Sequence, residues 1–250
     1  MAGHSKWANI KHKKAATDKK KGKIFSRFAK EIMVAAKDGG GDIDMNPRLR
    51  TAVAAAKAQN MPNDNIDRAI KKGTGELGDV IFEEIMYEAY GPEGVAMLIE
   101  CLTDNRNRSA SDVRATLTRG NGSLAGSGAV AWMFKRQAHF IVTGDNADED
   151  ILMDVVLDAG AEDIDVEDGV AEIWGPTTCF EDCMKAFEAA NIATETAEII
   201  FKAENNTELK DASTANKVLA LIDKLEDLDD VQAVHANYVI DDSIADQIEA

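Results

Sequence analysis

The sequence predicts an α+β protein of three domains: an N-terminal three-helix domain followed by two ferredoxin-like α/β sandwich domains, the second inserted into the first. Short apolar patterns of helical period, separated by Gly and Pro, fill the chain up to about residue 78. Further along, the apolar runs follow the order βαββαβ of a ferredoxin-like sandwich. A ββαβ unit precedes that segment, and the helix and strand that this unit lacks come after it. We therefore expect domains at residues 1–79, at residues 80–136 together with 207–250, and at residues 137–206.

The first domain is expected to contain three short helices joined by tight turns. The first helix ends at the glycines 39–41, and its apolar stripe consists of Ile24, Phe25, Phe28, Ile32 and Ala36. Asn46-Pro47 predicts an N-cap followed by the first residue of a second helix, which runs to about Gln59. Asn63 is expected to cap a third helix that ends at Gly73.

The middle domain is expected to begin with strands at residues 84–90 and 95–103, joined by the turn Gly91-Pro92-Glu93-Gly94. A helix over residues 107–119, a glycine-rich loop and a strand at Ala129–Phe134 complete the first unit. The C-terminal segment then supplies a helix capped by Ser213 and a strand at Ala233–Val239.

The inserted domain is expected to contain four strands and two helices. The strands are predicted at residues 139–142, 163–166, 170–174 and 195–201. Asp168-Gly169 is a strong signal for a tight hairpin between the second and third of them. The helices are predicted at residues 148–159 and 178–190, and the inward residues of the former are expected to be Ile151, Leu152, Val155 and Val156.

Charge is distributed very unevenly along the chain. The formal net charge is −17, yet the first thirty residues contain ten Lys or Arg and a single acid, Asp18. The remaining residues contain 18 basic and 44 acidic groups. This asymmetry is typical of a segment that binds a polyanion while an acidic remainder keeps the rest of the surface away from it.

Composition narrows the class of protein further. No apolar run approaches the roughly 18 residues that cross a bilayer, and no apolar stretch follows the basic start as in a secretory signal. The cysteines, Cys101, Cys179 and Cys183, are sparse and odd in number, which indicates reduced thiols in a cytoplasm. We expect a cytoplasmic protein with no membrane contact and no small-molecule substrate.

The run Gly3-His4-Ser5-Lys6-Trp7-Ala8-Asn9-Ile10-Lys11-His12-Lys13-Lys14, followed by Gly22-Lys23-Ile24-Phe25, resembles the amino-terminal signature of the YebC/PmpR family. Further matches are Asn46-Pro47-Arg48-Leu49-Arg50, Met61-Pro62, Tyr90-Gly91-Pro92 and Thr103-Asp104-Asn105-Arg106-Asn107-Arg108. The resemblance implies a cytoplasmic protein of three domains, helical and then two α/β, with no known enzymatic reaction. Bacterial members are classed as probable DNA-binding transcriptional regulators, whereas other members look like translation factors that act on ribosomes.

The residues expected to contact nucleic acid are mostly basic and cluster in the N-terminal arm, with a second group near residue 106. They are Lys6, Trp7, Asn9, Lys11, His12, Lys13, Lys14, Lys19, Lys20, Lys21, Lys23, Arg27, Arg106 and Arg108. Lys ammonium groups neutralise phosphates without reading bases, and Trp7 could stack on an unpaired base. The alternatives are a solvated arm whose Trp7 packs on the helical domain, and a second group that is a solvated face partly neutralised by Asp104 and Asp112.

Other patterns are not supported as active or ligand sites. Gly120, Gly122, Gly126 and Gly128 follow a helix and precede a strand, the reverse of a P-loop, so a mobile loop that could lie along a nucleic-acid backbone is expected. The acidic stretch 163–169 does not fit a calcium loop, and Cys179 with Cys183 does not complete a zinc site. We expect no catalytic residue, metal or cofactor.

These observations predict a non-enzymatic nucleic-acid-binding regulator. Two interpretations stay open at this point: a transcriptional regulatory protein that binds double-stranded DNA, and a ribosome-associated translation factor that binds ribosomal RNA. A Lys-rich arm serves either target equally well.

Overall fold

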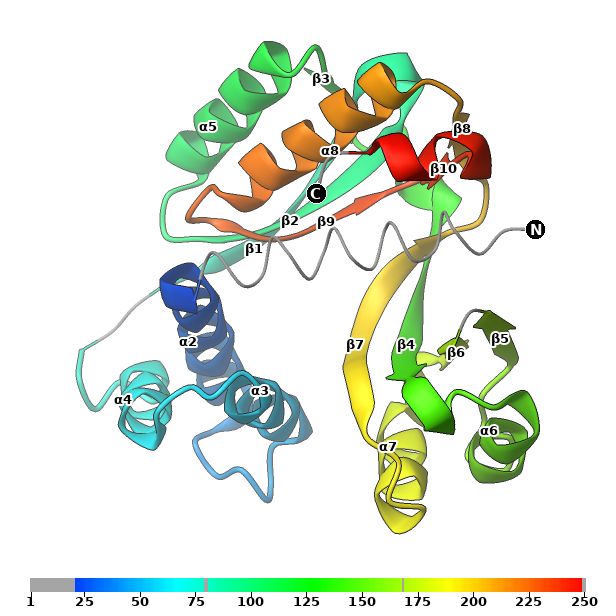
Figure 1. The fold of residues 1–250 in the computed structure, drawn as a ribbon. Coiled ribbons are helices and arrows are strands. Elements are labelled where there is room, and N and C mark those ends of the chain that lie inside the picture. Colours follow the sequence, from blue (N-terminus) through cyan, green and yellow to red (C-terminus); the bar gives the residue numbers. More distant parts are fainter. Residues whose placement is uncertain (1–20, 79–80, 168, 249–250) are drawn as a thin grey trace.

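The computed structural model describes residues 21–78, 81–167 and 169–248 (Figure 1). The first domain consists of α2 (Lys21–Gly39), α3 (Pro47–Ala58) and α4 (Asn63–Gly73). Their apolar faces meet in one core that includes Ile32, Leu49 and Ile66. The predicted three-helix domain is confirmed, and the arm residues before Lys21 lie outside the described residues.

The turn between α2 and α3 is organised by Asn46. Its side-chain oxygen accepts from the Leu49 N–H at 3.1 Å, as predicted for an N-cap, and its amide donates to the carbonyls of Ala35 and Gly40 at 2.7 and 2.8 Å. A Cβ at Gly39 would lie 2.6 Å from the Asn46 amide nitrogen, so the chain needs glycine there. The prediction that Asn63 caps the third helix is wrong, because Asn63 is already the first helical residue after Pro62.

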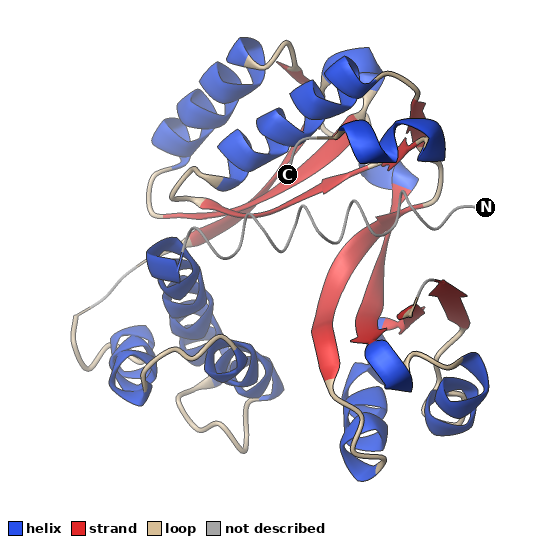
Figure 2. Ribbon diagram, viewed as in Figure 1, coloured by secondary structure: helices blue, strands red, loops and turns tan. Residues whose placement is uncertain are grey.

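The middle domain is a two-layer sandwich. Its strands are β1 (Glu83–Tyr90), β2 (Ala96–Thr103), β3 (Ser123–Leu124) and β9 (Val231–Ala236), and its helices are α5 (Arg106–Arg119) and α8 (Ala212–Glu226). The sheet has the order β3-β1-β2-β9, and β9 pairs antiparallel with β2 although the inserted segment separates them in the chain. Both helices cover one face of this sheet (Figure 2), where Met97 and Ile99 pack against Val113 and Val218.

The expected strand at Ala129–Phe134 is wrong. The third strand of this sheet is β3, which lies inside the glycine-rich segment and pairs Leu124 with Ala89. Residues Ala131–Met133 instead form a 3-10 turn, because the buried carboxylate of Glu88 accepts hydrogen bonds from successive backbone N–H groups there. A carboxylate that collects these N–H groups curls the segment, so it cannot form a strand ladder.

The C-terminal segment departs from prediction at two points. Asp211, and not Ser213, caps α8, since the carboxylate of Asp211 accepts from the Thr214 N–H at 2.7 Å. The single strand expected at Ala233–Val239 is divided into β9 and β10 (Tyr238–Ile240) at Asn237. The Asn237 side-chain oxygen accepts from the Ala96 N–H at 2.7 Å, after which β10 pairs with β8 (Thr207–Leu209) in a separate two-stranded sheet.

The inserted segment forms the second sandwich. Its elements are β4 (Phe134–Thr143), α6 (Glu149–Val156), β5 (Asp163–Glu167), β6 (Val170–Pro176), α7 (Phe180–Ala189) and β7 (Thr194–Ala203). The sheet order β5-β6-β4-β7 is that of a ferredoxin-like βαββαβ unit, as predicted. The two-residue hairpin is confirmed, because Glu167 pairs with Val170 and Gly169 has a φ of +75°.

The prediction for α6 needs two corrections. The helix ends at Val156, before a turn at Gly160, rather than at Ala159. Ile151 was expected to point inward, but 48% of its surface is exposed, whereas Leu152 and Val156 are buried.

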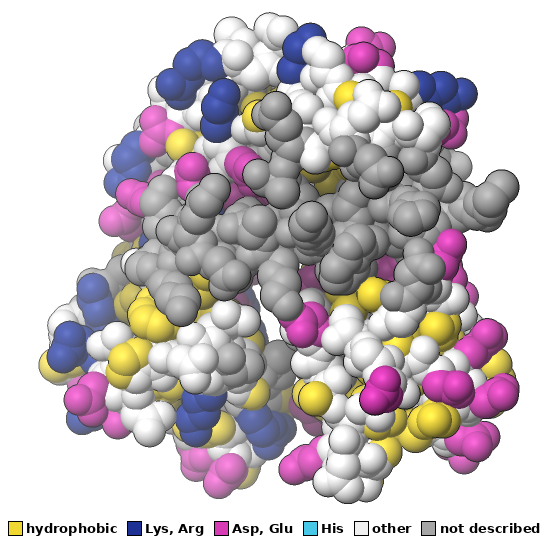
Figure 3. Space-filling model, in the orientation of Figure 1, with side chains coloured by type: hydrophobic (Ala, Val, Ile, Leu, Met, Phe, Trp, Pro, Cys, Tyr) yellow, Lys and Arg dark blue, Asp and Glu magenta, His cyan; other side chains and the backbone are white. Residues whose placement is uncertain are grey.

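The helical domain and the inserted domain both attach to the face of the middle sheet that α5 and α8 leave uncovered (Figure 1). The long strands β4 and β7 reach this face through an apolar cluster of Ala96, Leu98, Val130 and Phe134, flanked by Phe201. On the side of the molecule shown in Figure 3, a gap is visible between the two lobes, and acidic side chains gather on the inserted lobe. The lobes nevertheless approach each other where Arg50 lies 3.9 Å from Glu181. No helix in the described part of the chain is long and apolar enough to span a bilayer.

Candidate nucleic-acid interface

The predicted arm leads directly into the first described helix. Lys21 and Lys23 occupy the first turn of α2, and Arg27 follows on the same helix. The other arm residues lie outside the described residues, namely Lys6, Trp7, Asn9, Lys11, His12, Lys13, Lys14, Lys19 and Lys20. Their role in binding therefore stays a prediction, whereas the structure places the point where the arm begins.

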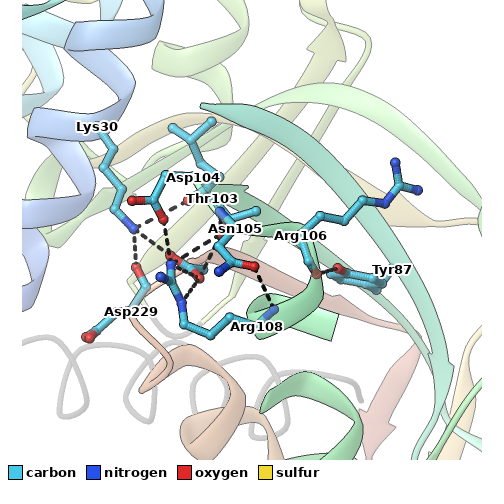
Figure 4. Close-up of polar contacts among 10 residues, drawn as sticks. Lys30, Tyr87, Thr103, Asp104, Asn105, Arg106, Arg108 and Asp229 are labelled. Atoms are coloured by element: carbon cyan, nitrogen blue, oxygen red, sulfur yellow. Dashed lines mark hydrogen bonds and ion pairs between the residues drawn. The ribbon is translucent and has the colours of Figure 1, made fainter. Parts of the chain in front are cut away.

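Two basic residues that follow Lys23 on α2 contact the middle domain. The guanidinium of Arg27 donates to the backbone carbonyl of Glu226, at the C-terminal end of α8. The ammonium group of Lys30 donates to the carbonyl of Asp229 at 2.7 Å and to a carboxylate oxygen of Asp230 at 3.0 Å (Figure 4). These two cations thus connect the helical domain to the turn before β9.

Asp230 is the centre of this contact, which we call the domain joint (Lys30, Thr103, Arg108 and Asp230). One of its oxygens accepts from the Arg108 guanidinium at 2.8 Å and from the Thr103 hydroxyl at 2.9 Å. Burial opposes ionisation of Asp230, but the hydrogen bonds from Arg108, Lys30 and Thr103 outweigh it, so the pKa of this carboxyl lies below its ordinary value. The joint therefore holds an ionised carboxylate between two cations from different domains.

Arg108 was predicted to be an exposed phosphate contact. Its side chain is 47% exposed and also makes ion pairs within the protein, and the phosphate contact stays a prediction. Besides Asp230 it binds Asp104 at 2.7 Å, so two carboxylates already neutralise its guanidinium. The N-cap Asn105 accepts from the Arg108 N–H at 3.1 Å and thereby fixes the start of α5 beside the joint. The run of residues 103–108 thus serves to connect β2, α5 and β9.

Arg106 behaves differently from Arg108. Its side chain is exposed and points away from the joint in Figure 4, and no polar partner of it lies among the described residues. Its backbone carbonyl accepts from the Tyr87 hydroxyl at 3.4 Å, which secures the first turn of α5. Of the predicted pair near residue 106, only Arg106 presents its charge to solvent without an internal counter-ion.

Arg48, in the run Asn46-Pro47-Arg48-Leu49-Arg50, makes a second connection between domains. Its guanidinium binds Glu31 at 2.9 Å and Asp38 at 3.2 Å, both on α2, and it also pairs with Glu84 of β1. Arg50, two residues further on, lies 3.9 Å from Glu181 of α7. The arginines of α3 therefore have acidic partners inside the protein and are poorly placed to read bases.

Sequence reasoning missed the domain joint and the role of Glu88. In the sequence, Lys30 is one of ten basic residues among the first thirty, and Asp230 is one of 44 acidic residues in the remainder, so nothing indicates that the two would pair. Glu88 accepts from the N–H groups of Val130 and Ala131 at 2.7 and 2.8 Å, and also from Gly128. Burial raises the pKa of Glu88, yet these backbone hydrogen bonds lower it by more, so it stays below its ordinary value. These contacts anchor the end of the predicted mobile loop, at Gly128, and the first residues of the predicted strand.

The structure offers no support for a metal or thiol centre. No group of three or more His, Cys, Asp or Glu side chains suited to a metal ion occurs within the described ranges. Cys101, Cys179 and Cys183 are all buried, and burial raises the pKa of Cys101 to about 11. Buried thiols with raised pKa values are poor nucleophiles and poor ligands at neutral pH.

Fold and surface together define a class: a three-domain α+β protein whose basic N-terminal segment enters a helical domain braced against two α/β sandwiches. Family comparisons give the same division. The chain matches the model described as the TACO1/YebC protein N-terminal domain over residues 5–76 and the model of the TACO1/YebC second and third domain over residues 82–238. The chain belongs to the TACO1/YebC family.

Relatives match along the whole length. A "Probable transcriptional regulatory protein" of Syntrophobacter fumaroxidans is 52% identical over 248 residues, covering 99% of this chain and 100% of the relative. A protein of the same name from Halothermothrix orenii is 52% identical over 250 residues, with 99% of both chains covered. The crystal structure of a conserved hypothetical protein from Aquifex aeolicus superposes with a TM-score of 0.79 at 41% identity, over 88% of this chain and 90% of that one.

Proposed function

We propose that this protein is a non-enzymatic regulator that binds nucleic acid through its N-terminal arm, and that it acts as a DNA-binding transcriptional regulatory protein in the cytoplasm. The observation that carries the proposal is the concentration of ten Lys or Arg in the first thirty residues of a chain of net charge −17. The names of the full-length relatives, probable transcriptional regulatory proteins, agree with it.

The arm has the chemistry of a phosphate-binding segment. Flexible Lys side chains neutralise backbone charge and release condensed counter-ions, so affinity falls steeply with salt. If about six of them contact phosphates, log K should fall against log salt with a slope of roughly −5. Four basic residues outside the arm already bind acidic or carbonyl partners within the protein, namely Arg27, Lys30, Arg48 and Arg108. This supports the arm as the main source of phosphate contacts.

The acidic inserted domain would limit how the protein approaches its target. From Gln137 to Met184 the sequence contains 14 Asp or Glu and no Lys or Arg. Such a surface is repelled by phosphates and is suited to a basic protein. The nucleic acid would therefore meet the arm and the helical domain while the inserted lobe points away from it.

The alternative is a ribosome-associated translation factor that binds RNA. One observation favours it: both arginines of α3, Arg48 and Arg50, are paired with acidic residues of the protein itself. A regulator that recognises a promoter directly needs side chains that contact bases in the major groove. A factor that docks on a large RNA particle does not.

Competition binding and sedimentation separate the two. A transcriptional regulator should retain particular promoter fragments over random duplex by roughly 10³ or more. A ribosome factor should discriminate little among duplexes, sediment with ribosomal particles at physiological salt, and lose this on deletion of residues 1–20. A promoter footprint that persists in excess competitor, without co-sedimentation, would exclude the translation interpretation. Failure of the intact protein to bind any nucleic acid at low salt would exclude both.

A further inference from the structure

Trp132 is an exposed aromatic residue on an anchored turn. It lies in the 3-10 turn Ala131–Met133, where β4 leaves the middle domain, and 67% of its surface is exposed. A Trp side chain on an ordered segment normally buries most of its large apolar surface. The exposed ring is therefore available to a ligand.

The turn beneath Trp132 is held from two sides. On the polar side, the Glu88 carboxylate accepts from the N–H groups of Val130 and Ala131 at 2.7 and 2.8 Å. On the apolar side, the side chain of Val130 is fully buried in a cluster with Leu98 and Phe134. A ring mounted on such a turn loses little backbone freedom when a ligand binds, which favours affinity.

The orientation of the indole is also set. Its Nε1–H donates to the carbonyl of Ala129 at 3.1 Å, and the Tyr90 hydroxyl donates to the same carbonyl at 3.4 Å. The single polar atom of the Trp132 side chain is thereby satisfied inside the protein. The exposed remainder is carbon ring surface, which suits stacking rather than hydrogen bonding.

The charge around Trp132 is unusual for this chain. Between Arg119 and Arg136 there are three basic residues and no Asp or Glu, although acidic residues outnumber basic ones 45 to 28 overall. Arg119, Lys135 and Arg136 are all exposed. The other exposed residues of this segment are small or polar, namely Asn121, Ser123, Gly126, Ser127, Gly128 and Ala131. Two acidic residues also lie close: Glu88 is buried beneath the turn, and the N–H of exposed Glu204 donates to the Met133 carbonyl at 2.8 Å. An apolar ring among small and polar residues, followed by Lys135 and Arg136, fits a base and its phosphates better than an apolar pocket on a protein.

We propose that Trp132 is a stacking platform for an unpaired base of single-stranded RNA or DNA, and that the exposed cations that follow it, Lys135 and Arg136 on opposite faces of β4, attract the phosphates of that strand. The inference rests on the proposed nucleic-acid binding and deepens it, because it assigns a second contact point beyond the arm and names a single-stranded segment as its ligand. Aromatic stacking of this kind tolerates any base, so the platform adds affinity without sequence specificity.

The test is a titration of labelled short oligouridylate, oligothymidylate and a duplex with the intact protein, followed by fluorescence anisotropy. Trp132→Ala should weaken binding of one or both single strands by about fivefold to a hundredfold and leave duplex binding within about twofold. Trp132→Phe should restore most of the affinity. The matched control is Met45→Ala, since Met45 is 78% exposed on the helical domain and should not contribute. Comparing the two single strands tells whether RNA or DNA is the better ligand.

Salt dependence distinguishes the platform from the arm. Trp132→Ala should keep the wild-type salt slope because stacking releases no counter-ions, whereas Lys135→Gln with Arg136→Gln should make the slope shallower by up to roughly two. Equal single-strand affinities of Trp132→Ala and wild type would overturn the inference while leaving arm binding intact. Loss of a protein partner from Trp132→Ala with unchanged oligonucleotide binding would assign the ring to a protein interface and also overturn it. If the intact protein binds no oligonucleotide, the proposed function itself fails.

Discussion

The ammonium group of Lys30 on α2 lies 3.0 Å from the carboxylate of Asp230, two hundred positions further along the chain. The same carboxylate binds Arg108 at the start of α5 and the hydroxyl of Thr103 at the end of β2. Together with the contacts of Arg27 and Arg48, this acidic side chain joins the helical domain to the middle domain.

Lys30→Met should loosen the domain joint. The substitution leaves the carbonyls of Asp229 and Leu102 without their donor, so we expect a loss of about 1–3 kcal/mol in the free energy of unfolding. Spin labels on Asp67→Cys and Asp112→Cys should report a broader distance distribution between α4 and α5. The native thiols are buried, which directs the labels to the introduced cysteines. The control is Arg106→Gln, and an equal effect of that exposed substitution would contradict a specific role for Lys30.

Acid should weaken the same joint. The pKa of Asp230 is lower in the folded protein than its ordinary value near 3.9, so its contribution to stability is present above that value and is lost as pH falls through the folded pKa. We therefore expect urea stability to drop as pH falls below about 5, and to drop less in Asp230→Asn. The same pH dependence in wild type and variant would show that other carboxyls account for the loss.

Glu88→Gln should release the turn that carries Trp132. A glutamine offers one accepting oxygen, while its NH2 group would face N–H donors that Glu88 now satisfies. We expect about 1–3 kcal/mol of destabilisation and faster hydrogen exchange confined to residues 128–131. Glu93→Gln, at an exposed position of the turn before β2, is the control and should change neither. Unaltered hydrogen exchange in Glu88→Gln would mean that the apolar contacts of Val130 are enough to hold the turn without Glu88.

Truncation tests the discontinuous domain, which stays a prediction. A chain that stops at Glu204 lacks α8 and β9, and so exposes the edge of β2 and the apolar side chains that contact Val218. We expect it to lose cooperative unfolding of the middle domain, whereas a fragment of residues 134–206 should fold alone because it contains all four strands and both helices of its sheet. Calorimetry measures whether each of the two fragments unfolds cooperatively. An unfolded 134–206 fragment would show that the inserted unit depends on the cluster around Phe134.

Arm substitutions test the source of affinity. Deletion of residues 1–20, or joint replacement of Lys11, Lys13 and Lys14 by Glu, should reduce nucleic-acid affinity at least tenfold and make the salt dependence shallower. The fold of the described residues should be unaffected, as judged by circular dichroism. Unchanged affinity in a gel-shift titration at moderate salt would remove the arm from the interface.

Local sequence signals predicted most of the elements but not all of their pairings. The hairpin at Gly169 and the cap at Asn46 depend on neighbours a few residues away, and both are present as predicted. Two predicted strands were wrong because of hydrogen bonds between strands. Glu88 of β1 binds N–H groups in the segment 129–134, and Asn237, inside the predicted C-terminal strand, binds the Ala96 N–H of β2. Long-range polar contacts of this kind leave no periodic trace in the sequence.

The sequence by itself determined the three-part architecture and the basic arm, since apolar periodicity and net charge are properties of contiguous residues. Only the tertiary structure decided which partner each charged side chain has. Arg108 looked like a phosphate contact, yet its partner Asp230 lies 122 positions away and comes within reach only when β9 pairs with β2. Trp132 looked like part of a strand, yet it is exposed because Glu88 bends the chain beneath it. Contacts between residues far apart in the chain form only in the folded sheet. They decide which side chains have partners within the protein and which are exposed to a partner molecule.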